Sequence, residues 1–228
     1  MSNTTDYERE TLHAYRTEAR ASDYKRLQTT AWTWARFVTW REQHLLAREL
    51  SRYEWSPDDR LLDIPCGTGI LGGILHRFPF RIVGSDISPE MMALARSEYP
   101  QDRLEDCVLT DITQTPFPRG SFACVVTLGL LHRMPVDVKH ATLAEISALT
   151  ARIALVSCSV DTRFQRFKHA VLGWLRRTHV PAPCPARMSE IVAECESHGF
   201  RVVRTIRVVP LLSSHAIFVL ERVTKHVE

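Results

Sequence analysis

The stretch RLLDIPCGTG, residues 60–69, decides the fold of this chain. It combines a short apolar run, an acid at the end of that run, Asp63, and a glycine-containing turn. A second apolar run, RIVGSD at residues 81–86, ends on another acid, Asp86, which comes 17 residues after Gly69. An acid at that place typically holds ribose hydroxyls. The two runs therefore predict a nucleoside-type cofactor site at the ends of two adjacent strands.

From residue 60 onward, the pattern alternates between strands and helices. Ser88, Pro89 and Glu90 are typical of an N-cap, a first helical position and a first turn. Alternation of this kind predicts an α/β fold in which helices cover both faces of a mostly parallel sheet. We expect strands at 60–64, 81–86, 105–110, 121–128 and 152–159, and helices at 69–78, after Ser88 and at 136–149.

The N-terminal part of the chain reads differently. Residues 1–55 contain almost no Gly or Pro and predict helices at 6–20, 22–28 and 30–52. In the last of these, apolar residues recur with helical spacing and are expected to face a core: Trp34, Phe37, Val38, Leu45, Leu46 and Leu50. We expect residues 1–55 to form a helical cap or lid, and residues 56–228 to form the main domain.

The C-terminal part predicts a closing pair of strands. A helix at 187–198 should end at Gly199, and strands at 200–209 and 215–222 follow. Their link is too short for a crossover helix, so the two strands should be antiparallel. An inserted helix with basic and apolar sides is expected at 163–178, within an insertion at about 160–185.

Composition excludes several classes of protein. The 228 residues are 45% hydrophobic and 24% charged, as in an ordinary globular domain, and the net charge of +3 is too small to indicate nucleic-acid binding. The first 30 residues lack an apolar signal-peptide core, and no apolar run approaches the roughly 18 residues of a membrane span. The expected location is the cytoplasm.

Six cysteines are expected to be reduced and structural: Cys66, Cys107, Cys124, Cys158, Cys184 and Cys195. Cys184, Cys195 and His198 are the nearest approach to a metal set. Their spacing fits no common zinc site, so no metal is expected.

The glycine turn allows two interpretations. Residues 67–72 read G-x-G-x-x-G, which is typical of dinucleotide binding. Asp63, however, would repel an arriving pyrophosphate. A carboxylate at this place is better matched to a cationic amine, such as that of a methionine moiety. An NAD(P)-dependent oxidoreductase therefore remains the alternative to a sulfonium-cofactor enzyme.

These motifs together resemble the class I S-adenosylmethionine-dependent methyltransferases. Residues 63–69 are similar to that family's first motif, residues 117–128 to its fourth-strand motif, and Leu130, Leu131 and His132 to the step that follows the strand in many small-molecule members. The resemblance covers about residues 55–222. It implies a Rossmann-like, doubly wound sheet of seven strands with a closing antiparallel pair, and S-adenosylmethionine as the cofactor.

The resemblance also implies a set of cofactor-binding residues. Asp86 matches the acid that holds the ribose, and Asp111 with Ile112 matches the pair that cradles the adenine. Pro65 replaces the family's first glycine, and Ala123 stands where an acid is usual, so one backbone approach and one packing detail should differ. The full expected set is Asp63, Pro65, Cys66, Gly67, Gly69, Asp86, Ile87, Met91, Asp111, Ile112 and Leu128.

The implied reaction moves a methyl group to a small-molecule acceptor. His132, at the carboxyl edge of the sheet, is the expected base or acceptor-positioning residue. Aromatic residues near the N-terminus and the basic segment at 163–178 favour an amphiphilic or lipid-linked acceptor and contact with a membrane surface. O-methylation is the favoured reaction. No nucleic-acid partner is expected. A non-catalytic, S-adenosylmethionine-binding regulatory subunit remains a further alternative.

Overall fold

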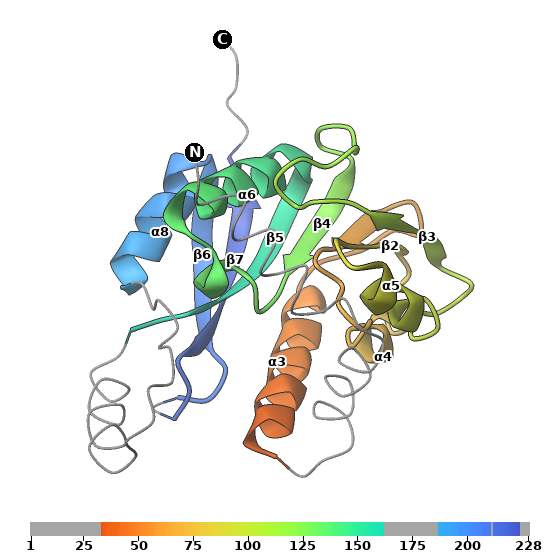
Figure 1. Cartoon of the computed structure of the whole chain (residues 1–228), viewed down its shortest axis with the longest axis horizontal. Coiled ribbons are helices and arrows are strands. Elements are labelled where there is room, and N and C mark those ends of the chain that lie inside the picture. Colours follow the sequence, from red (N-terminus) through yellow and green to blue (C-terminus); the bar gives the residue numbers. More distant parts are fainter. Residues whose placement is uncertain (1–32, 162–186, 211, 224–228) are drawn as a thin grey trace.

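Seven strands form one sheet in the order β3-β2-β1-β4-β5-β7-β6 in the computed structural model, which describes residues 33–161, 187–210 and 212–223 (Figure 1). Neighbouring strands from β3 to β5 are parallel, whereas β7 runs antiparallel to both β5 and β6. The strands are β1 (Arg60–Asp63), β2 (Arg81–Asp86), β3 (Leu104–Leu109), β4 (Phe122–Thr127), β5 (Thr150–Ser159), β6 (Phe200–Arg207) and β7 (His215–Arg222). The predicted seven-stranded sheet with a closing antiparallel pair is confirmed.

Helices cover both faces of this sheet (Figure 1). They are α3 (Trp34–Leu50), α4 (Gly72–Leu75), α5 (Pro89–Ala95), the 3-10 helix η1 (Leu131–Arg133), α6 (Val136–Leu149) and α8 (Met188–Ser197). One apolar cluster joins the sheet to α3, α4 and α5, and the other joins it to η1, α6 and α8. The helices expected at 6–20, 22–28 and 163–178 lie outside the described residues, so the division into cap, domain and insertion stays a prediction.

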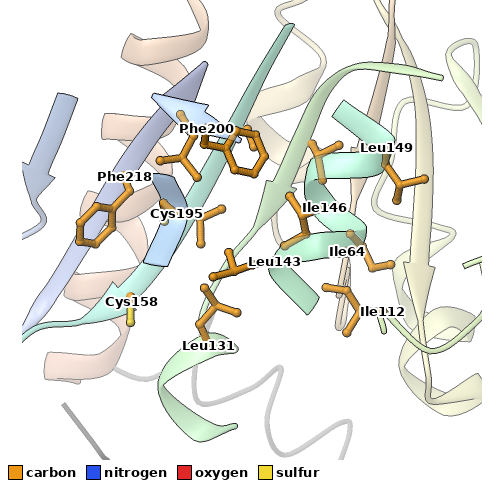
Figure 2. Packing of buried hydrophobic residues seen from close by; sticks show 14 of the residues in the cluster. Ile64, Ile112, Leu131, Leu143, Ile146, Leu149, Cys158, Cys195, Phe200 and Phe218 are labelled. Carbon is orange, nitrogen blue, oxygen red and sulfur yellow. The ribbon is translucent and has the colours of Figure 1, made fainter. Parts of the chain in front are cut away.

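Alternation along each buried strand supplies both clusters. Cys124 and Val126 of β4 face α3 and its neighbours, whereas Val125 between them faces α6. A period of two is what a strand covered on both faces requires, because successive side chains point to opposite sides. Figure 2 shows the α6 and α8 side, where Leu143 and Ile146 lie among residues of the sheet and α8.

Local sequence explains where most helices begin and end. The Ser88 hydroxyl accepts the Met91 N–H at 3.2 Å, and Pro89 is the first residue of α5, as predicted. Gly199, with φ 80°, follows α8 at its predicted end. The helix expected at 69–78 is wrong in length, because α4 spans only Gly72–Leu75. Gly69 has φ 75°, which is not helical, so the helix cannot begin at this residue.

The expected core face of α3 is partly wrong. Val38, Leu46 and Leu50 are buried, but Trp34 and Phe37 are 51% and 43% exposed. The aromatic residues form a separate row in which Phe37 contacts Trp34 and Trp40, with ring centroids 5.6 and 6.1 Å apart.

Cysteines within the described ranges are free and buried, as expected for structural thiols: Cys66, Cys107, Cys124, Cys158 and Cys195. Cys184 falls outside those ranges. The helices that the structure describes include none whose length and apolar character would carry it across a membrane.

Candidate functional site

Asp86 organises the glycine turn from the end of β2. Its Oδ2 accepts the Gly67 N–H at 2.8 Å, and its Oδ1 accepts the Ser88 N–H at 2.9 Å. Burial raises the pKa of Asp86, while these backbone hydrogen bonds act to lower it. The Ile87 N–H also hydrogen-bonds this carboxylate, so of its roughly four acceptor positions one remains for a ligand hydroxyl. The site can therefore hold the turn and a ribose at once.

Two glycines of the turn serve different purposes. A Cβ on Gly67, with φ +53°, would meet nothing within 4 Å, so this residue borders open space. A Cβ on Gly69, with φ +75°, would lie 2.7 Å from Cα of Ala95, so this glycine allows the turn to pack against α5. Of these two glycines, Gly67 is the one with room beside its backbone for a ligand. Pro65, half-buried beside it, follows a cis peptide bond from Ile64.

The N–H groups of the turn are largely used within the protein. Gly67 donates to Asp86 at 2.8 Å, Gly69 donates to the Cys66 carbonyl at 2.9 Å, and Gly72 donates to the Gly69 carbonyl at 2.9 Å. A dinucleotide turn instead points such donors at a pyrophosphate. This arrangement disfavours the oxidoreductase alternative on geometric grounds.

Asp63 is buried at the end of β1, with 2% of its surface exposed. Its Oδ2 accepts the Tyr99 hydroxyl at 2.6 Å, and Tyr99 reaches it by lying against Gly84 of β2. Burial raises the pKa of Asp63 to about 7; the Tyr99 hydrogen bond opposes the rise, and the charge of Asp86 adds to it. Burial also raises the pKa of the neighbouring Cys66 thiol, which argues against a thiolate nucleophile.

The expected adenine-side residues surround the ends of β2 and β3. The Thr110 N–H donates to the Asp86 carbonyl at 3.1 Å, which joins the two strand ends. Asp111 is half-buried, and its Oδ1 accepts the Thr113 N–H at 2.7 Å and the Thr113 hydroxyl at 2.9 Å. Ile112 is buried in the cluster under α6, beside Ile64 (Figure 2).

The remaining apolar members of the expected set flank this region. Met91 is buried in the first turn of α5, and Ile87 is half-buried just before that helix. Leu128 follows β4 and packs on the α3 side of the sheet.

His132 lies apart from the acids. It is buried in η1, and its ring centroid is 5.5 Å from that of His215 in an edge-to-face arrangement. His215 begins β7 and pairs with Ser159 of β5. Since β1, β4 and β5 lie between β2 and β7, His132 is near a different part of the carboxyl edge from Asp86.

The sequence interpretation missed Glu42 on α3. This side chain is 8% exposed, and its Oε1 has no hydrogen-bond partner. Burial raises the pKa of Glu42 to about 7, and a hydrogen bond with the Ser157 hydroxyl opposes the rise. The signal was readable, because Glu42 interrupts the buried stripe that Val38 and Leu46 continue at four-residue spacing.

Ser157 connects Glu42 to the loop after β4. The Gly129 N–H donates to the Ser157 hydroxyl oxygen at 2.8 Å, which leaves the hydroxyl proton for Glu42. The next residue on the helix, Gln43, donates from Nε2 to the Ile70 carbonyl in the glycine turn at 2.7 Å. Helix α3 is therefore held at both the glycine turn and the end of β5. Among the described residues, no group of three or more His, Cys, Asp or Glu is arranged to hold a metal.

Comparison with known proteins agrees with this geometry. Residues 61–152 match the family model described as a methyltransferase domain, which spans β1 to the start of β5. A demethylmenaquinone methyltransferase of Chlorobaculum parvum is 40% identical over 48 residues, 21% of this chain and 20% of that protein. The matched region thus spans about a fifth of the length of that curated relative.

Solved structures share the fold over much more of the chain. A magnesium protoporphyrin IX methyltransferase from Synechocystis PCC 6803, with bound S-adenosylhomocysteine, aligns with a TM-score of 0.76 at 17% identity, covering 93% of this chain and 99% of that one. A geranyl diphosphate C-methyltransferase from Streptomyces coelicolor A3(2) aligns with a TM-score of 0.56 at 14% identity, covering 79% and 76%. At these identities the likeness concerns the fold.

Proposed function

We propose that this chain, whose residues 61–152 match the methyltransferase-domain family model, transfers a methyl group from S-adenosylmethionine to a small-molecule acceptor. The observation that carries the proposal is the arrangement of Asp86 and Gly67. Asp86 shapes the turn and keeps hydrogen-bonding capacity, while Gly67 leaves open space beside it. A turn of this kind suits a nucleoside whose other end is cationic, because the nearby acid Asp63 would repel an anion.

The described residues fit this cofactor. Asp86 would accept a ribose hydroxyl, Asp111 and Ile112 would border the adenine, and Asp63 would favour the amine of the methionine end. Pro65, Cys66, Ile87, Met91 and Leu128 would form the walls, and Gly69 keeps the turn against α5. When bound, the cofactor supplies a methyl group already activated by its sulfonium. What remains for the protein is to align an acceptor and exclude water.

His132 is the proposed base or acceptor-positioning residue. A hydroxyl acceptor must lose its proton during methylation, and a histidine at the carboxyl edge is suited to take it. The contact with His215 supports the assignment, since a second ring beside His132 restricts its orientation. We expect His132→Ala to lower turnover with little change in cofactor affinity. Unchanged turnover would remove this role.

The proposed acceptor is amphiphilic, and O-methylation is favoured. Support comes from the exposed aromatic row of α3, formed by Trp34, Phe37 and Trp40 on the helix that also carries Gln43 to the glycine turn. Such a row offers an apolar surface that the packing of the sheet does not use. If the row contacts a lipid surface, wild type should co-sediment with anionic vesicles, and Trp34→Ser/Trp40→Ser should not. Absence of wild-type binding would refute the membrane part alone.

The first test is isothermal titration of the wild type with S-adenosylmethionine and, separately, with NADH. We expect binding of the sulfonium cofactor only, with Asp86→Asn weakening it at least roughly 10-fold because one charged acceptor is lost. Binding of NADH alone would support the oxidoreductase alternative. Binding of S-adenosylmethionine without transfer to any hydroxyl-bearing amphiphile tested would favour the regulatory subunit.

A further inference from the structure

Glu42 places a carboxyl group among the buried residues of α3. It lies on the apolar stripe of α3 between Val38 and Leu46, where a hydrophobic residue would satisfy the packing. Its Oε1 has no hydrogen-bond partner. A buried carboxylate with an unused oxygen is costly unless a cation or a donor joins it. An unpaired acid buried at this position therefore points to a ligand.

The position of Glu42 is fixed from two sides. The Ser157 hydroxyl holds one carboxyl oxygen, and Ser157 is itself held by the Gly129 N–H at 2.8 Å. Gln43, the next residue along α3, contacts Ile70 of the glycine turn at 2.7 Å. The carboxyl group is therefore held at the carboxyl end of β5, on the helix that touches the turn.

The protein supplies no cation to Glu42 among the described residues. Arg204 of β6 pairs with Glu49, which is about two helical turns further along α3. His215 on β7 contacts His132, and Asp63 at the end of β1 is itself an acid. The pKa of Glu42 is raised by burial and opposed only by Ser157. A positive charge from outside the chain would stabilise the ionised form.

We propose that Glu42 binds the α-ammonium of the methionine end of the cofactor. This inference rests on the proposed function. An ammonium group has three N–H donors and a positive charge, so it can donate to the unused Oε1 of Glu42 and pair with the ionised carboxylate. Binding would also expel the proton that Glu42 carries near neutral pH, since the ion pair favours the carboxylate.

Three ligands separate the parts of this proposal in isothermal titration. S-adenosylmethionine carries both sulfonium and ammonium, S-adenosylhomocysteine carries only the ammonium, and 5′-methylthioadenosine lacks the whole amino-acid end. We expect Glu42→Gln to bind the first two roughly 10- to 100-fold more weakly and the third unchanged. Glu196→Gln, an exposed helical control on α8, should bind all three as wild type does.

Proton release gives a second readout that is independent of turnover. Wild type and Glu42→Gln are each titrated with S-adenosylhomocysteine at pH 7 in two buffers of different ionisation enthalpy, which gives the number of protons released per ligand bound. Wild type should release about half a proton more than Glu42→Gln. The ligand's own titration cancels in this difference. Should Glu42→Gln not fold, Glu42→Met takes its place; it also lacks the titrating carboxyl group on the apolar stripe of α3, so it should show the same smaller release.

The outcomes separate the inference from the function on which it rests. Failure of wild type to bind S-adenosylmethionine would refute both. Equal binding by wild type and Glu42→Gln would refute only the role of Glu42. If Glu42→Gln also bound 5′-methylthioadenosine equally more weakly, Glu42 would have a structural role. If only S-adenosylmethionine bound more weakly, Glu42 would interact with the sulfonium. Either result overturns the ammonium assignment.

Discussion

Glu42 should make the protein without cofactor less stable as pH rises. Burial raises the pKa of Glu42 from 4.5 to about 7, so between these values the unfolded chain loses the proton while the folded chain keeps it. The unfolded state then binds fewer protons, and the free energy of unfolding falls as pH increases. A pKa difference of about 2.5, at about 1.4 kcal/mol per unit, corresponds to about 3 kcal/mol lost between roughly pH 4.5 and 7.

The variant Glu42→Gln removes this titration while its amide oxygen can still accept from Ser157. We expect its stability at pH 5 to resemble that of wild type, and its stability at pH 8 to exceed it by up to about 3 kcal/mol, roughly 6–12 °C in Tm for a chain of this size. Urea or thermal unfolding from pH 5 to 8 measures both profiles. Glu196→Gln is the matched control. Parallel profiles for wild type and Glu42→Gln would refute the reasoning.

Two further predictions concern the glycine turn and Asp63. Gly69→Ala should lower the free energy of unfolding in urea by about 2–5 kcal/mol, because its Cβ would lie 2.7 Å from Cα of Ala95 at a left-handed φ. Gly67→Ala should lower it by only about 1 kcal/mol, yet weaken cofactor binding in titration calorimetry. Tyr99→Phe should destabilise the protein by about 1–3 kcal/mol at pH 8 and less at pH 5, because it leaves the ionised Asp63 without its donor; equal losses at both pH values would contradict this.

Local signals in the sequence were sufficient for most of the sheet and for several helices. Helix α6 spans Val136–Leu149, the range predicted, and Ser88 with Pro89 correctly predicted the start of α5. These features depend on neighbours within a turn or two along the chain. The short α4 was misjudged because the conformation of Gly69 follows from its contact with Ala95, which sequence alone does not reveal.

Helix α3 shows why the site was only partly predictable. The apolar residues that were grouped on one face belong to two: Val38 and Leu46 face the sheet, whereas Trp34 and Phe37 are exposed. Because the two rows were treated as one, the interruption of the buried row by Glu42 was overlooked. Tyr99 was missed for another reason: its partner Asp63 is 36 residues away along the chain, and their contact depends on the small size of Gly84.

The insertion of β7 between β5 and β6 has a consequence for folding during synthesis. Strand β5 pairs with β7 along Ile153–Ser159. Of the strands that the structure describes, β7 is the last along the chain. Until residues 215–222 have left the ribosome, β5 must remain an open edge whose apolar side chains lack their neighbours. A ribosome stalled before residue 215 should thus carry a nascent chain that still recruits chaperones, and release of β7 should end that dependence.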